Sequence, residues 1–411
     1  MKKATLIFPL LGALLVGCTD EIPMVNLGID EVYYIPRMSK LPLESALTGK
    51  EYRWTVDGTT VGTDRRYIFL AQEEGDYRLT FDIIDAETPY HLEFTVHVLH
   101  EEIEYSPYIA RVYEYCPAPG QFVNEMPQYS PGDTYADILQ KAEDCISGTN
   151  DIMITLGGYG GYVTFGFDHT VVNVPGENDF RIWGNAFYEL TNPEAKGGSA
   201  EPGIVMVSYD RNCNGLPDDE WYELAGSEFR SAATRHNYTI TYRRPDPAHI
   251  PVEDESGYLD DVEYIPWSDS LGDTGFIAKN IFHNQSYYPL WTDADELTFC
   301  GSLLAPNGID LSGTGRYYVL YAYDWGYVDN HPNDFADLNS FDIGNAVDAE
   351  GNRVNLPGAD FVRVYTGLNQ YCGWLGETST EIARACDLHI DLPGVPLPDP
   401  LSENNSTTFI K

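Results

Sequence analysis

Oxygen-bearing side chains crowd a short run of the sequence that begins at Asp210. The run reads Asp-Arg-Asn-Cys-Asn-Gly-Leu-Pro-Asp-Asp-Glu over residues 210–220. Carboxylate and amide oxygens at positions one, three and five, a glycine at six and carboxylates from position nine are what a hard cation needs around a tight loop. The spacing therefore predicts a structural calcium site. Its expected ligands are Asp210, Asn212, Asn214, the Leu216 carbonyl, and one or two of Asp218, Asp219 and Glu220.

This loop departs from the EF-hand pattern in two ways. Trp221 occupies position 12, where a bidentate glutamate belongs, and we expect strands rather than helices on both sides. The identity of the last ligand therefore stays open. Asn214-Gly215 is also a strong hairpin-turn dipeptide, so a turn without a metal is the alternative, and the two interpretations are compatible.

Two other runs place aromatic rings beside amides and carboxylates in glycine-containing loops. Stacking rings and hydrogen-bonding amides suit a neutral polar ligand. Aromatic packing beneath long loops is the alternative, and the sequence leaves it open. The candidate ligand-binding residues are Trp325, Tyr327, Asp329, Asn330, His331 and Asn333 in the first run, and Asn369, Gln370, Tyr371 and Trp374 in the second.

Signatures of catalysis are few, and we expect no enzyme. The run His100-Glu-Glu-Ile-Glu has glutamate where the second histidine of a zincin belongs, and Gly-x-Ser-x-Gly does not occur. The glycine run 156–162 lacks the Lys-Ser/Thr of a phosphate-binding loop, so it predicts a turn between two strands. Glycosidase chemistry stays open, because 64 acidic residues guarantee chance carboxylate pairs.

The elements that must position these residues are almost all strands. Alternating apolar and polar residues predict a small sandwich over residues 29–100, a linker at 101–132, a larger jelly-roll-like sandwich over 133–392 and a tail at 393–411. Strands are expected at 152–156, 162–167, 180–183, 204–209, 238–242, 317–321 and 361–365. One short helix is expected after Thr134-x-x-Asp137, a capping box. The fold class is therefore all-β.

The amino-acid composition limits the classes of ligand that the chain can bind. The chain has 64 acidic against 24 basic residues and a net charge of −40, which repels nucleic acid and anionic lipid and suits cations or neutral ligands. Beyond Cys18, three disulfides or unpaired thiols are equally compatible with Cys116, Cys145, Cys213, Cys300, Cys372 and Cys386. Neither the pairing of these cysteines nor the oligomeric state follows from the sequence.

The first residues have the pattern of an exported protein. Lys2 and Lys3 precede an apolar run at 6–16 that is too short to span a bilayer, which predicts a signal peptide at 1–17. Leu15-Val16-Gly17-Cys18 resembles the bacterial lipobox, which implies a lipid on Cys18 followed by a tether at 18–28. Thr19-Asp20-Glu21 resembles the acidic tag of Bacteroidota surface lipoproteins and implies the outer surface of the outer membrane. A periplasm-facing anchor is the alternative.

Two resemblances extend this interpretation. Tyr52-x-Trp54-x-Val56, Gly75-Asp76-Tyr77 and Thr95-Val96-His97-Val98 resemble PKD-like immunoglobulin-type domains, which implies a spacer with Trp54 in its core. Runs at 163–168, 201–208, 341–352, 360–365 and 376–381 resemble a group of Bacteroidota surface lipoproteins from nutrient-uptake loci.

The second resemblance implies that the chain is a non-catalytic protein. It would bind a small nutrient, with a corrinoid such as cobalamin as first guess and a glycan as second, and pass it to a TonB-dependent outer-membrane transporter. A surface glycoside hydrolase and a structural or adhesive protein are the alternatives.

Overall fold

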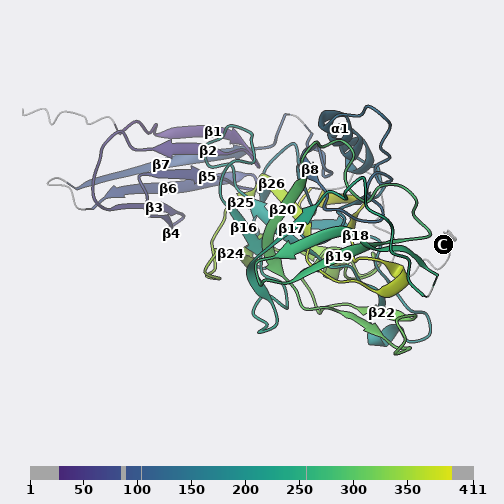
Figure 1. Cartoon of the computed structure of the whole chain (residues 1–411). Helices are drawn as coiled ribbons and strands as arrows, with labels where there is room; N and C mark the ends of the chain where they lie inside the picture. Colours follow the sequence, from purple (N-terminus) through teal and green to yellow (C-terminus); the bar gives the residue numbers. More distant parts are fainter. Residues whose placement is uncertain (1–26, 85–88, 103, 256, 391–411) are drawn as a thin grey trace, which may run out of the picture. The chain divides into compact units, whose positions relative to one another are not determined.

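The computed structural model describes residues 27–84, 89–102, 104–255 and 257–390 (Figure 1). The described residues form two compact units. The first takes in those up to Tyr33, Pro42–Tyr67 and Tyr77–Val96, and the second takes in Tyr34–Leu41, Ile68–Asp76 and those from His97 on. Strands dominate both units, and the predicted all-β, sandwich-type fold class is confirmed. Among the described residues, no helix is both long and apolar enough to span a bilayer. The predicted signal peptide, Cys18 and the tail lie outside the described residues.

Seven strands between residues 32 and 99 form two small sheets. The five-stranded sheet has the order β1-β7-β6-β3-β4, and β2 pairs with β5. Trp54 is fully buried and its ring lies 4.1 Å from that of Phe81, as expected of a core tryptophan. Asp57 and Gly58 both have positive φ and turn β3 into β4. The bounds are β1 Val32–Pro36, β2 Leu41–Glu44, β3 Tyr52–Val56, β4 Thr59–Gly62, β5 Arg66–Phe69, β6 Gly75–Ile83 and β7 Tyr90–Leu99.

A six-stranded sheet with the order β24-β16-β15-β26-β10-β8 is the centre of the second unit. Its neighbouring strands are antiparallel where their registers are known. Successive side chains of a strand face opposite ways, so Val205 and Val207 of β15 enter one core and Ile204 the other. Both faces of the sheet are therefore buried. The bounds are β8 Arg111–Cys116, β10 Tyr162–Gly166, β15 Gly203–Ser208, β16 Trp221–Leu224, β24 Ala346–Val347 and β26 Phe361–Thr366.

A four-stranded sheet, β19-β18-β17-β20, packs on one face of the central sheet (Figure 1). Tyr238, Ile240 and Tyr242 alternate along β17 and point into the shared core, where they meet Tyr159 and Tyr365. This tyrosine-rich core is the floor on which the candidate site is built. The bounds are β17 Arg235–Arg243, β18 Leu259–Asp269, β19 Thr274–Asn280 and β20 Glu296–Leu303.

The helix α1 (Tyr135–Ile146) and the remaining short strands complete the second unit. Ile138, Ala142 and Ile146 of α1 pack into the core on the other face, and the predicted capping box between Thr134 and Asp137 is confirmed. The short strands are β9 Ile154–Thr155, β11 Val171–Val172, β12 Phe180–Trp183, β13 Phe187–Tyr188, β14 Gly197–Ser199, β21 Gly308–Asp310, β22 Tyr318–Tyr321, β23 Ser340–Phe341, β25 Gly358–Ala359, β27 Glu381–Ile382 and β28 Arg384–Asp387. The 3-10 turns are Pro193–Ala195, Ala336–Asn339, Ile343–Asn345 and Gly373–Leu375.

Each of the seven strands predicted between residues 150 and 392 is present. The expected linker at 101–132 is wrong for part of its length, because β8 lies inside it as an edge strand of the central sheet, paired with β10. The sequence predicted a linker here because prolines and tyrosines lie on either side of this strand. The six cysteines between residues 116 and 386 are free thiols, with Cys213 and Cys300 exposed.

Candidate functional site

A cavity of about 100 Å³ opens where the four-stranded sheet meets the loop that follows β26. Tyr242, Trp267 and Phe276 reach it from β17, β18 and β19, one from each strand. The loop contributes polar and aromatic groups to the same cavity, namely Asn369, Gln370, Tyr371, Glu377 and Thr378. Rings from a rigid sheet thus face amides and a carboxyl from a loop, the combination that binds neutral polar ligands.

Hydrogen bonds fix the shape of this loop. Tyr371 and Glu377 pair across it as an antiparallel bridge, and the Cys372 N–H donates to the Gly376 carbonyl over 2.8 Å. The Gln370 side chain accepts from the Gly308 N–H and donates to Asn307 Oδ1, so it braces the loop. The wall of the cavity is therefore preorganised, which lowers the entropy lost when a ligand binds.

Glu377 is the unusual group of the cavity. Its side chain is only 6 % exposed, and Oε1 accepts a hydrogen bond from the Gln121 N–H. Among the described residues, Oε2 has no hydrogen-bond partner. Burial raises the pKa of Glu377 to about 8. The carboxyl is therefore mostly protonated at neutral pH and carries an unused O–H or carbonyl at the cavity.

The glycine run at 156–162 allows close packing of the backbone beside the cavity. The run turns β9 into β10, which confirms the predicted glycine turn between two strands. Gly157 has φ +68°, and a Cβ on it would lie 1.9 Å from the Ala118 carbonyl oxygen. Gly158 lines the cavity beside Tyr242. The glycines therefore bring the backbone up to the candidate site.

The predicted ligand-binding residues are split between two places. Asn369, Gln370 and Tyr371 line this cavity, and Trp374 stands on the same loop with 37 % of its surface exposed. Trp325, 44 % exposed, lines a separate cavity of about 170 Å³ together with Asp337, Asp342 and Asn345. The sequence runs 324–334 and 369–377 therefore do not form one site.

Four other predicted ligand-binding residues of the 324–334 run lie in the interior. Tyr327, Asp329, Asn330 and His331 are at most 1 % exposed. Asn330 accepts from the Tyr323 N–H and donates to the Tyr323 carbonyl, and Asn333 donates to the Gly184 carbonyl. These hydrogen bonds hold the loop in place.

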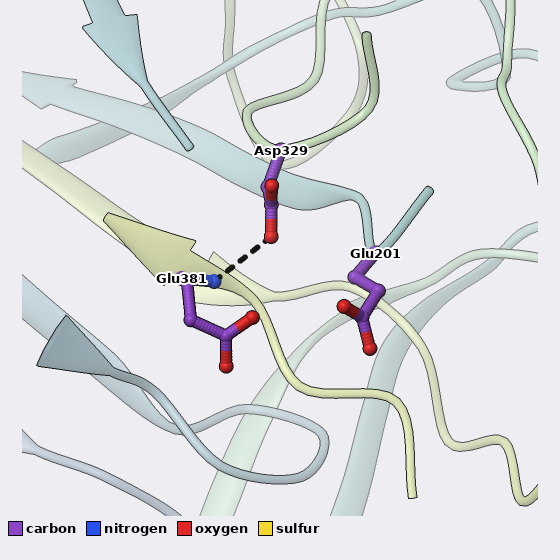
Figure 2. A group of neighbouring side chains, drawn as sticks. All are labelled: Glu201, Asp329 and Glu381. Atoms are coloured by element: carbon purple, nitrogen blue, oxygen red, sulfur yellow. Dashed lines mark hydrogen bonds between the residues drawn. The ribbon is translucent and has the colours of Figure 1, made fainter. Parts of the chain in front are cut away.

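Asp329 belongs to a buried cluster of three carboxylates with Glu201 and Glu381 (Figure 2). One oxygen from each lies within 4.8 Å of the others. Figure 2 shows the Asp329 carboxylate directed at the backbone of Glu381, with the Glu381 and Glu201 carboxylates on either side below it. Asp329 accepts from the N–H groups of Asn185, Ala186 and Glu381, and a Cβ on Gly184 would lie 2.4 Å from its Oδ1. Glycine at 184 is therefore needed for the cluster to form.

This cluster can hold either protons or a hard cation. Burial, and then the neighbouring Glu201, raises the pKa of Asp329 to about 8, and burial raises the pKa of Glu381 well above its usual range. Thr155 and Ser379 donate hydrogen bonds to Glu381 Oε1. Oxygen ligands alone suit calcium or magnesium. Without a cation, three carboxylates this close must share protons at neutral pH.

The predicted calcium loop at 210–220 links β15 to β16, and its side chains converge. Asp218 accepts hydrogen bonds from the amides of Asn212 and Asn214, and Asp210 accepts from the N–H groups of Asn214 and Gly215. Asp219 accepts from the Arg211 N–H, and Glu220 from the Tyr222 hydroxyl. Among the three candidate acids, Asp218 is thus the one that is hydrogen-bonded to both asparagines. Asp219 and Glu220 instead form hydrogen bonds at the ends of the loop.

Comparisons with known proteins add little. No family model and no curated protein matches the chain. A quinoprotein alcohol dehydrogenase-like protein from Bacteroides thetaiotaomicron is 14 % identical over 22 % of this chain and about a fifth of its own length, with a TM-score of 0.16. A carbohydrate-binding module of the β-sandwich superfamily is 10 % identical over 87 % of this chain and 94 % of its own, with a TM-score of 0.15. TM-scores this low support no functional conclusion.

Proposed function

We propose that this chain is a non-catalytic binding protein that captures a neutral sugar at the cavity beside Glu377. The observation that carries the proposal is Glu377, which lines a cavity together with aromatic rings and whose buried Oε2 atom has no partner among the described residues. A buried polar atom without a partner is unfavourable by about 1–3 kcal/mol. A ligand hydroxyl that bonds to it removes this penalty, while the rings cover the apolar face of the sugar.

Charge favours a neutral ligand, and size favours a sugar over the corrinoid that the sequence suggests. The net charge of −40 disfavours anionic ligands and leaves neutral ones unaffected. The cavity is small, at about 100 Å³. It can take one edge of a sugar ring, but the macrocycle of a corrinoid is many times larger.

The remaining parts of the proposal come from the sequence. We propose that the chain is held at the outer membrane by a lipid on Cys18, faces the cell surface and passes its ligand to a TonB-dependent transporter. A calcium ion in the 210–220 loop, held by Asp210, Asn212, Asn214 and Asp218, would stabilise the binding unit. The convergence of these side chains supports that ion set.

Calorimetric titration of the purified chain with neutral monosaccharides, in the presence of calcium, tests the proposal. Glu377→Met, which keeps the volume and removes the hydrogen-bonding group, should weaken binding at least tenfold. Tyr371→Ala should weaken it similarly. Trp325→Ala, in the separate cavity, is the matched control and should bind as the wild type does.

Four outcomes would contradict the proposal. Absence of binding to any neutral sugar, or sugar binding that Glu377→Met leaves unchanged, would remove the site. If the chain binds cobalamin and the Tyr371→Ala variant does not, the ligand is a corrinoid. Release of reducing sugar from an oligosaccharide would indicate a glycoside hydrolase instead.

A further inference from the structure

Three exposed aromatic rings form a row beside the cavity. They are Trp374, Phe282 and Tyr258, with exposed fractions of 37 %, 52 % and 41 %. The Trp374 and Phe282 ring centres are 5.9 Å apart, and those of Phe282 and Tyr258 are 6.4 Å apart. Exposed apolar patches on soluble proteins mark interaction surfaces, ligand-binding grooves among them.

The row is continuous with the cavity through the loop 371–377. That loop carries Tyr371 and Glu377 at the cavity and Trp374 at its outer turn. Trp374 is held in place by a hydrogen bond from its indole N–H to the Arg316 carbonyl, over 3.0 Å. The ring at the start of the row is therefore fixed before any ligand arrives.

A chain of hydrogen bonds ties the second ring to the same loop. The Phe282 N–H donates to Asn280 Oδ1, and the Asn280 amide donates to Gln121 Oε1 over 2.8 Å. Gln121 in turn donates from its side chain to the Leu375 carbonyl and from its backbone to Glu377. The backbone and side chain of one buried residue, Gln121, thus position both the Glu377 carboxyl at the cavity and the aromatic row.

We propose that the ligand is a chain of sugar rings, with one ring at the Glu377 cavity and the following rings stacked along Trp374, Phe282 and Tyr258. The inference rests on the proposed function and extends it from a single sugar to an oligosaccharide. Sugar rings have an apolar face and a polar edge, so a row of exposed aromatic rings suits a glycan chain. The Phe282 and Tyr258 rings lie 25° from parallel and the Trp374 ring meets Phe282 at 67°, so successive sugars would stack on ring faces that turn along the row. The small cavity and the long row are then two parts of one site.

The test is the dependence of affinity on chain length. The probes are neutral homo-oligosaccharides of one to six residues from the glucose, mannose, galactose and xylose series, titrated calorimetrically into the purified chain. In the series that binds, we expect the affinity to rise about tenfold or more between one and four residues. Trp374→Ala and Phe282→Ala should flatten this rise and leave the affinity for the single sugar unchanged.

Control variants separate this inference from the proposed function. Trp325→Ala should keep the full rise, and Glu377→Met should weaken every member of the series alike. Thermal melting of each variant checks that it is folded; Phe282→Leu, which keeps bulk without the ring, replaces Phe282→Ala if the alanine variant melts early. If a single sugar binds as tightly as a tetramer, the inference that the ligand is an oligosaccharide is wrong, whereas the proposed sugar site at the cavity still stands. Failure of all four series to bind would overturn both.

Discussion

At the scale of single residues, the protonation of Glu377 decides what the cavity can bind. The pKa of about 8 means that the carboxyl donates a hydrogen bond at neutral pH, because the neutral form carries a proton. Ionisation would place an unpaired charge beside Tyr242 and Tyr371, in a site that excludes most water. The ligand atom that meets Oε2 is therefore expected to be an acceptor, such as a sugar ring or hydroxyl oxygen.

A pH series of sugar titrations tests this assignment. Affinity should be constant from pH 6 to pH 7 and should fall as the pH rises through about 8, since the ionised carboxyl has no proton to donate. Glu377→Gln replaces the O–H by an amide N–H and should make the affinity independent of pH between 6 and 9. Parallel pH profiles of the two proteins would show that Glu377 does not contact the ligand.

Glu377 was not among the residues that the sequence marked as ligand-binding, although Tyr371 and Trp374 of the same loop were. Aromatic rings in a glycine-rich loop are a local signal. The burial of Glu377 depends on the sheet strands and on Gln121, which are far away in the sequence. With 64 acidic residues in the chain, the sequence also does not distinguish one carboxyl from the others. The Glu201, Asp329 and Glu381 cluster was missed for the same reason.

At the scale of elements, the helix α1 is the part whose local sequence is most explicit. Thr134 accepts from the Asp137 N–H, and Asp137 accepts from the Thr134 N–H over 2.8 Å. Thr134→Ala should lower the free energy of unfolding by about 1 kcal/mol. Urea denaturation measures it, with Thr134→Ser as the variant that should restore the cap. Equal stability of the alanine variant and the wild type would show that the cap contributes nothing.

The loop 210–220 gives the second prediction at this scale. At a calcium concentration 100-fold above the dissociation constant, an ion bound only by the folded protein adds about 2.7 kcal/mol. EDTA should therefore lower the melting temperature by on the order of 5–10 °C, and calcium should restore it. Asp218→Asn should melt at one temperature with or without calcium. If EDTA does not change the melting temperature of the wild type, the loop is a hairpin turn that binds no calcium.

Strands were easier to predict than the way in which they pack. Alternation of residues located β12 and β26 because their buried faces are rich in Phe, Ile and Val. β18 and β19 were missed, because β18 carries acids along its length and a proline at 266, which a central strand rarely has. Yet these two strands supply Trp267 and Phe276 to the cavity, so the sequence indicated only one wall of the site.

At the scale of the whole molecule, buried ionisable groups couple stability to pH. Asp329, Glu377 and Glu381 have raised pKa values because they are buried. His169 and His389 also have raised pKa values; burial opposes the shift, but hydrogen bonds to neighbouring aspartates outweigh it. Each group binds a proton more tightly in the folded state than in the unfolded chain, so its contribution is complete at low pH and is lost as the pH rises through the folded pKa. His331, whose pKa is lowered, opposes this trend below about pH 6.5.

The free energy of unfolding should therefore fall between pH 5 and pH 8.5, by on the order of a few kcal/mol, since one pKa unit corresponds to about 1.4 kcal/mol. Urea denaturation with EDTA present, at half-unit steps of pH, measures the slope without a contribution from bound cations. Glu377→Gln and Glu381→Gln should each flatten it, because an amide does not ionise. Asp295→Asn, whose side chain is 89 % exposed, is the control and should leave the slope unchanged. A stability that rises over this range would mean that the buried carboxyls ionise freely, and would contradict the sharing of protons in the Glu201, Asp329 and Glu381 cluster.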